Sequence, residues 1–242
     1  VLLHVMVVLF VATLIRSAFG FGEALIAVPL LALRIPVAVA APLAVLMSIT
    51  VAVTIIVQDW RQIHVRSAVW LVLAALFGIP LGLLLLVAVD ERIVKGLLAL
   101  VIVSFSAYCL LGRNIPRLKH DHRAWLLGCG FLSGILGGAY GMNGPPLIVY
   151  GTLRRWSPQH FRATLQGYFL PASMVVMIGY WFSGLWVPAV TQYYIDCLPA
   201  TILAIVLGRV VNRRMSGAVF LTATYIGLIA IGILLFAQAV HR

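Results

Sequence analysis

The sequence predicts an all-α polytopic membrane protein built from two inverted repeats, each a glycine-broken helical hairpin followed by three transmembrane helices. Three observations predict this fold. Hydrophobic residues make up 63% of the 242 residues and charged residues only 10%, against about 25% charged in soluble domains. Apolar runs of membrane-spanning length alternate with short basic clusters. The pattern of breaks and loops also returns in the second half of the chain.

The repeat is visible at one constant offset. Gly20 and Gly141 are 121 residues apart (141 − 20), and at this offset Ala18 also aligns with Ala139. No gap is needed along the whole length, and breaks, loops and apolar runs coincide although few residues are identical. Because internal repeats reflect repeated structural units, we divide the chain into two repeats, residues 1–121 and 122–242.

Each repeat begins with a broken hairpin and continues with three longer apolar runs. In the first repeat we expect the hairpin at about 1–34 and helices at about 36–58, 68–89 and 93–111. In the second we expect the hairpin at about 124–154 and helices at about 158–180, 187–208 and 215–239. The polar stretch GRNIPRLKHDHR, residues 112–123, is the expected linker, on the cytoplasmic side. The first apolar run is not expected to be a cleaved signal peptide, because no small-residue cleavage site leads into a soluble domain.

The distribution of basic residues decides between parallel and inverted repeats. If each hairpin crossed the membrane once, the loop lysines and arginines would divide seven against eight, without the cytoplasmic excess that membrane proteins show. If each break is instead the tip of a hairpin, eleven fall on one side and four on the other. The eleven are Arg61, Arg66, Arg113, Arg117, Lys119, Arg123, Arg154, Arg155, Arg209, Arg213 and Arg214, and the four are Arg34, Arg92, Lys95 and Arg242. The count favours inversion.

The second arm of the first hairpin is too short to span a membrane. Residues 23–33 cover only about 17 Å as a helix, at 1.5 Å per residue, whereas the hydrocarbon core is about 30 Å thick. The short arms are therefore expected to stop inside the membrane. Two hairpins that enter from opposite faces would place their tips near the midplane.

The stretch GAYGMNGPPLIVY, residues 138–150, is the tip of the second hairpin. Irregular backbone at membrane depth is tolerated only where protein or a water-filled cavity receives it, and broken helices in inverted repeats mark transporter substrate sites. Glycines let backbone N–H groups approach a ligand, and the amides of residues 140–144 are the expected donors. Pro145 and Pro146 suit the first turn of a helix, whose positive end would face an anion. The alternative is that the glycines serve only close helix packing.

Charged and polar residues near the two breaks are the candidate site residues, because ionisable groups inside a membrane are costly and usually functional. Arg16 or Arg162 would supply positive charge, and Glu23 or Asp196 would carry a coupling proton. Alternatively, Arg16 and Glu23 only neutralise each other or reach the interface, and Arg162 lies at the membrane face. The predicted substrate-binding set is Arg16, Ser17, Gly20, Gly22, Glu23, Tyr140, Gly141, Asn143, Gly144, Arg162 and Gln166.

Other classes of function find little support in the residues. The net charge of +11 reflects basic residues at helix ends, so no nucleic-acid partner is expected, and the partners are a small anionic substrate and the lipid bilayer. Cys109, Cys129 and Cys197 form no CxxC pair, and the HDH stretch at 120–122 lacks further ligands, so we expect neither a metal nor a cofactor. No nucleophile-elbow or zinc-protease motif indicates an enzyme. A homo-oligomer is an open alternative to a monomer.

The stretch GGAYGMNGPPLIVYGTLRRWSPQHFRATLQGYF resembles the second repeat of the sulfite exporter TauE/SafE family of bacterial membrane proteins. That repeat carries a glycine-rich G-G-x-x-G-x-G-G-P stretch, then a proline and an R-A-T-like triplet, found here at 137–146, Pro158 and 162–164. The first-half stretch FGFGEALIAVPLLAL is similar to the family's first repeat. Asn143 and Glu23 depart from the pattern, because glycine is usual at the first position and frequent at the second.

The resemblance implies a secondary transporter in the bacterial inner membrane that exports small sulfur-containing anions, such as sulfite, sulfonates or thiosulfate-like species, driven by an ion gradient. It leaves the substrate of this chain open, since some family members are thought to move other organic anions. An anion channel with the same basic site is the alternative. A titratable residue in the site favours coupled transport over a channel.

Overall fold

The computed structural model describes residues 1–59, 65–111, 123–154, 158–214 and 217–241. Within some helices the side chains of individual residues, Arg162 and Gln166 among them, lie outside the description. The described residues form helices and no strands. The helices are α1 (Leu2–Phe19), α2 (Glu23–Ala32), α3 (Val37–Asp59), α4 (Val65–Ala88), α5 (Glu91–Leu111), α6 (Arg123–Tyr140), α7 (Gly144–Leu153), α8 (Pro158–Phe182), α9 (Pro188–Arg214) and α10 (Gly217–His241).

Several helices have the length and composition of membrane spans. Among the described residues, four stretches qualify on both counts, namely Val37–Thr54, Ala68–Ala88, Glu91–Leu111 and Pro188–Gly208. Shorter apolar helical stretches fill much of the remaining fold. The all-helical, polytopic character predicted from the sequence is therefore confirmed. The short helices α2 and α7, each of ten residues, reach only about 15 Å.

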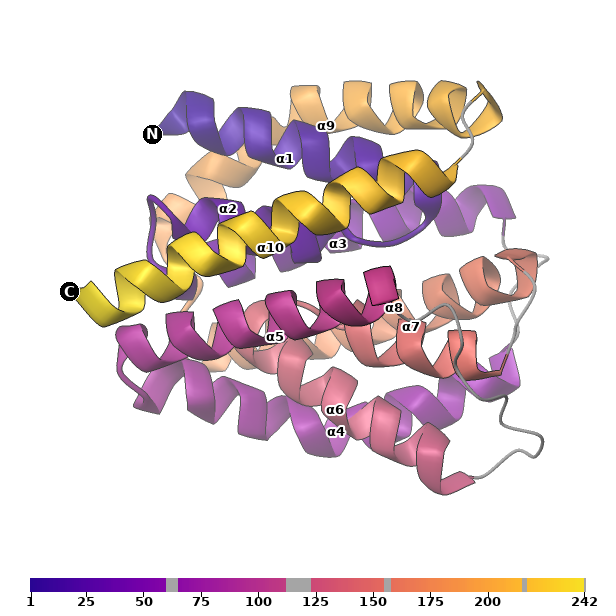
Figure 1. The fold of residues 1–242 in the computed structure, drawn as a ribbon, viewed down its shortest axis with the longest axis horizontal. Helices are drawn as coiled ribbons and strands as arrows, with labels where there is room; N and C mark the ends of the chain where they lie inside the picture. Colours follow the sequence, from indigo (N-terminus) through magenta and orange to yellow (C-terminus); the bar gives the residue numbers. More distant parts are fainter. Residues whose placement is uncertain (60–64, 112–122, 155–157, 215–216, 242) are drawn as a thin grey trace.

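The helix bounds repeat along the chain at the offset found in the sequence. The bounds of α6 and α7 exceed those of α1 and α2 by 121 residues at every end (123 − 2, 140 − 19, 144 − 23 and 153 − 32). In each hairpin the break falls between a long first arm and a ten-residue second arm. In Figure 1, α1 begins at the left end of the bundle and α6 begins at the lower right.

The two hairpins pack on helices from the other half of the chain. The main packing partner of α1 is α9, and that of α6 is α4. Figure 1 shows α1 beside α9 along one edge of the bundle, with α4 and α6 along the opposite edge. Helices α3 and α8 pack against each other and also contact the hairpins. The two breaks are therefore held between two interleaved groups of helices around a central pair.

Glycines allow α4 and α6 to approach until their backbones touch. A Cβ added at Gly78 or Gly82 of α4 would overlap backbone carbonyl oxygens of α6, and one at Gly134 or Gly138 of α6 would overlap those of α4. Such small-residue seams are typical of helix pairs in membranes, where close van der Waals packing replaces the hydrophobic effect. The seam fixes the long arm of the second hairpin to α4.

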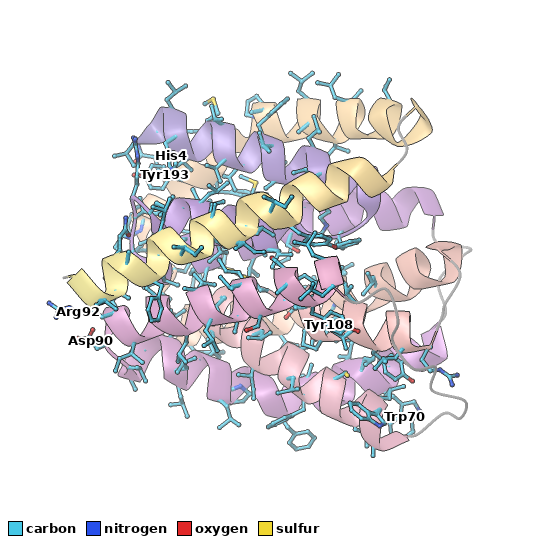
Figure 2. All side chains as sticks on the ribbon, viewed as in Figure 1. His4, Trp70, Asp90, Arg92, Tyr108 and Tyr193 are labelled. Carbon is cyan, nitrogen blue, oxygen red and sulfur yellow. The ribbon has the colours of Figure 1, made fainter. Side chains whose placement is uncertain are left out.

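The outer surface is apolar along the bundle and polar or aromatic at its ends. Phe77 and Leu84 are 76% and 60% exposed, as expected for side chains that face lipid. Figure 2 shows Asp90 and Arg92 at one end of the bundle and Trp70 towards the other. The Asp90 carboxylate accepts a hydrogen bond from the Arg92 N–H at 2.8 Å and so caps the start of α5.

The observed helices extend beyond some predicted bounds. Helix α4 begins at Val65 rather than 68, and α9 continues to Arg214 rather than 208. The apolar runs mark where lipid begins and ends, but backbone hydrogen bonding continues through the flanking arginines, which favour helices. Most of the predicted cytoplasmic linker, residues 112–122, lies outside the described residues.

Candidate functional site

A pocket lies where the two helix breaks meet. About 380 Å³ of space among its residues is unfilled by protein atoms, a figure that includes space open to the surroundings of the pocket. It draws on both hairpins and on the central helices α3 and α8. Its lining comprises Arg16, Phe21, Gly22, Glu23, Ala24, Leu25, Ser48, Gly141, Met142, Asn143, Gly144, Pro145, Ile148 and Phe169.

The first break depends on two glycines in the left-handed region. Gly20 has φ 85° and donates its N–H to the Arg16 carbonyl at 2.6 Å, which ends α1, and Gly22 has φ 95° directly before α2. Residues with a side chain rarely adopt such angles. The turn reverses the chain so that Arg16, in the last turn of α1, lies against Glu23, the first residue of α2.

Arg16 and Glu23 form a buried ion pair. Arg16 Nη1 lies 2.7 Å from Glu23 Oε2, and the side chains are only 3% and 1% exposed. The Thr13 hydroxyl donates to Glu23 Oε1 at 3.1 Å, and Arg16 Nη1 also donates to the Ser48 hydroxyl. Buried charges require such partners because desolvation is costly. The sequence left open whether these two residues bind a ligand or neutralise each other, and the structure shows them paired inside the pocket.

The other two nitrogens of the Arg16 guanidinium, Nε and Nη2, have fewer partners than Nη1. The Arg16 Cζ lies 5.2 Å from the centre of the Phe169 ring, a cation–π contact. Its Nε and Nη2 atoms are buried and have no hydrogen-bond partner among the described residues. An unpaired buried N–H costs about 1–3 kcal/mol, and such a group in a native structure calls for a ligand, a water or a role. The pocket therefore contains a cationic group with two unused donors.

The second break uses part of its backbone to end α6. Gly141, at φ 66°, donates its N–H to the Gly137 carbonyl at 2.8 Å, and Met142 donates to the Leu136 carbonyl at 3.1 Å. These two amides are therefore engaged within the hairpin. The expectation that all amides of 140–144 are free to bind a ligand is wrong for these two. The reason is that a helix end must satisfy its own carbonyl groups.

Asn143 occupies the centre of the second break. It is 3% exposed, and its Oδ1 atom is buried without a hydrogen-bond partner in the part of the chain that is described. The Ser133 hydroxyl donates to the Asn143 carbonyl and lies 2.9 Å from the Tyr168 hydroxyl, which fixes the backbone here. Helix α7 begins at Gly144, so both prolines lie in its first turn, where their missing N–H groups leave no bond unmade.

The predicted site residues fall into three groups. The residues that line the pocket are Arg16, Gly22, Glu23, Gly141, Asn143 and Gly144. Those outside the lining are Ser17, Gly20, Tyr140 and Asp196. The side chains of Arg162 and Gln166, both in α8, lie outside the described residues. Of the second group, Ser17 lies against Gly208 of α9, where an added Cβ would come within 2.5 Å of the serine Cβ.

Tyr140 and Asp196 lie outside the lining of the pocket. The Tyr140 hydroxyl donates to the Val94 carbonyl of α5 at 3.0 Å, so it braces the hairpin. Asp196 is half-buried on α9. The sequence singled out Tyr140 because it lies in the second break and Asp196 because it is a charged residue in an apolar run. Neither signal shows which neighbours the side chain faces.

Sequence reasoning missed Thr13 and Phe169, and it took Ser48 only as a weak pore-lining candidate, together with Thr50 and Thr54 of the predicted helix 36–58. Ser48 and Phe169 are 121 residues apart (169 − 48) and contact the same guanidinium from α3 and α8. The repeat offset would have identified them as equivalent positions. Nothing in their residue types alone distinguishes them from core residues.

One of three comparisons with known proteins found a match. The family model described as "Sulfite exporter TauE/SafE" matches residues 5–235. The search of curated proteins and the search of solved structures gave no match. Among the described residues, no three His, Cys, Asp or Glu side chains form a cluster that could hold a metal ion; the HDH stretch at 120–122 lies outside these residues.

Proposed function

Because the chain belongs to the sulfite exporter TauE/SafE family, we propose that it is a secondary transporter that exports small sulfur-containing anions such as sulfite or sulfonates. The observation that carries the proposal is the pocket between the two helix breaks, where two nitrogens of the Arg16 guanidinium, Nε and Nη2, are buried without a hydrogen-bond partner among the described residues. A small anion bound there would accept hydrogen bonds from them. This family consists of transport proteins, and the helices make the chain a multi-pass membrane protein.

The electrostatics of the pocket favour an anion over a cation. Helices α2 and α7 both begin at its lining, at Glu23 and Gly144. Each directs the positive end of its dipole, equivalent to about half a charge, towards the same space. Glu23 offsets the charge of Arg16, so the dipoles and the unpaired N–H groups provide the remaining attraction.

We further propose that the two halves are inverted repeats and that the anion binds near the membrane midplane. The hairpin bounds repeat at one offset, which supports two repeats. Two observations support inversion: α1 and α6 begin at opposite ends of the bundle in Figure 1, and the basic residues divide eleven against four only if the halves are inverted. Transporters of this kind expose a central site alternately to each side of the membrane.

Glu23 is the proposed proton carrier, and Asp196 is a second candidate. Glu23 shares Arg16 Nη1 with Ser48 and is held by Thr13, so it lies where protonation changes the charge of the site. Arg16 is the charged contact of Glu23 within the described residues, and neighbouring α3 contributes only the Ser48 hydroxyl. Protonated Glu23 would no longer balance Arg16, and the pocket would gain one positive charge for the anion. Proton and anion would thus bind together.

Flux measurements in proteoliposomes test the function. We expect saturable movement of sulfite or a sulfonate that increases with a pH gradient and is lost in Arg16→Ala, Asn143→Leu and Arg162→Ala. Arg34→Ala is the matched control, because it removes one exposed arginine outside the pocket lining and should preserve flux. Flux that is independent of any gradient would show a channel, and absence of flux with every anion tested would refute transport.

The topology can be tested in the bacterial cytoplasmic membrane, where we propose that the protein resides. Single cysteines introduced at 114–122 and at 156–157, in a background without Cys109, Cys129 and Cys197, should react with an impermeant reagent from the same cytoplasmic face. Labelling from opposite faces would contradict inverted repeats and leave the transport proposal to stand on the pocket alone.

A further inference from the structure

The Arg16 guanidinium presents two different edges. On one, Nη1 donates to the Glu23 carboxylate and the Ser48 hydroxyl. On the other, Nε and Nη2 are buried and without partners among the described residues. The Nε–H bond and one of the two N–H bonds of Nη2 lie in one plane and point in the same direction. Arginine can bind two oxygens at once through this edge.

The orientation of this plane is fixed by its neighbours. The Phe169 ring lies 5.2 Å from Cζ, and Phe169 is only 6% exposed. The aromatic ring therefore restricts how the guanidinium can tilt, while Glu23 and Ser48 restrict how it can rotate within its plane. An arginine that is held at Nη1 and covered over one face by an aromatic ring has little freedom to move.

We propose that Glu23, Ser48 and Phe169 hold Arg16 so that its Nε–Nη2 edge binds two oxygens of one oxyanion group, such as a sulfonate, sulfite or carboxylate. This inference rests on the proposed function and adds how the substrate is recognised. Because Glu23 already balances the charge of Arg16, the site selects by geometry more than by charge. An oxyanion offers two oxygens, so both N–H groups make straight hydrogen bonds, whereas a halide of equal charge accepts both at a single atom through bent and weaker bonds.

Phe169 and Ser48 act here as positioning residues. They contact Arg16 and line the pocket, and they come from equivalent positions of the two halves. Leucine in place of Phe169 would keep the site apolar but remove the ring that orients the guanidinium. Lysine in place of Arg16 would keep the charge but remove the planar pair of donors.

Anion binding to purified protein in detergent tests the inference. Calorimetry with sulfite, methanesulfonate, acetate and chloride should show the oxyanions binding at least tenfold more tightly than chloride. Arg16→Lys should remove most of this preference, and Phe169→Leu should reduce it several-fold. The matched control is Phe182→Leu, in the same helix but 84% exposed, which should leave the preference unchanged. Thermal unfolding identifies any variant that fails to fold.

The outcomes separate the inference from the proposed function. If the wild type transports anions but binds chloride as tightly as acetate, or if Arg16→Lys keeps the preference, the bidentate site is refuted and transport stands. If Arg16→Lys does not fold, Phe169→Leu decides, and an unchanged preference in that variant overturns the inference. If the wild type neither binds nor transports any of the four anions, both proposals fail.

Discussion

The Arg16–Glu23 pair provides the sharpest test of the site. Arg16→Met would leave the Glu23 carboxylate 1% exposed, with the Thr13 hydroxyl as its remaining partner. Removing one member of a buried ion pair costs about 3–5 kcal/mol, because the other charge stays buried and uncompensated. The reverse variant, Glu23→Leu, should be similarly costly, because the guanidinium would lose its carboxylate and keep two unpaired N–H groups.

The double variant Arg16→Met/Glu23→Leu should recover most of that loss. It removes both charges and fills the space with apolar side chains, and such replacements are often neutral or stabilising. In a chain of this size 1 kcal/mol corresponds to about 2–4 °C in Tm. Each single variant should therefore unfold about 6–20 °C below the wild type, and the double variant close to it, although it transports no anion.

Thermal unfolding of the four proteins in one detergent measures this coupling, with Arg34→Met as a control for the loss of an exposed arginine. If both single variants unfold within about 2 °C of the wild type, or if the double loses as much as the two singles added together, the reasoning fails. Additive losses would mean that the two side chains do not depend on each other.

Three further predictions concern the backbone around the site. Gly82→Ala should destabilise the folded protein by at least about 1–3 kcal/mol, because the new Cβ would lie 2.7 Å from the Ala139 nitrogen in the helix seam. The control Gly128→Ala adds a Cβ with nothing within 4 Å and should be neutral or stabilising. Thermal unfolding compares the two variants. Gly141→Ala should lower Tm more than Gly184→Ala. Both glycines have positive φ, but only at Gly141 would the new Cβ also meet the Val45 side chain, at 2.7 Å. Equal losses in Tm would show that backbone strain alone matters. Tyr180→Phe should lower the free energy of unfolding by about 1 kcal/mol and increase amide hydrogen exchange at the end of α6. The reason is that the Tyr180 hydroxyl donates to the carbonyls of Gly137 and Gly138. Unchanged hydrogen exchange would argue against this bond.

The sequence predicted the elements well, because glycine and proline act locally. Gly20 and Gly141 end their helices where the repeat offset places them, and the prolines begin α7 as expected. These features depend on backbone angles and on missing N–H groups, which can be recognised without knowing the rest of the fold.

The contacts of Arg16 could not be predicted in the same way. Glu23 is seven residues away across a turn and was a candidate partner, but Ser48 and Phe169 come from helices whose rotation is set by packing. A turn of 100° in either helix would point these side chains elsewhere. The engaged amides of Gly141 and Met142 were also missed, because the donors that remain free depend on how each helix end satisfies its own carbonyls.

The pairing of α1 with α9 and of α6 with α4 has a consequence for the order in which the protein is made. The start of α6 comes 35 residues after the end of α4 (123 − 88), and the start of α9 comes 169 residues after the end of α1 (188 − 19). At about 5–20 residues per second, α6 meets its partner within roughly two to seven seconds of synthesis. Helix α1, although inserted first, waits roughly ten to thirty seconds for α9. Of the two hairpins, the one that carries both charges of the pocket therefore completes its packing last. Nascent chains released before α9 would leave the face of α1 that places Ser17 against Gly208 uncovered and exposed to membrane quality control.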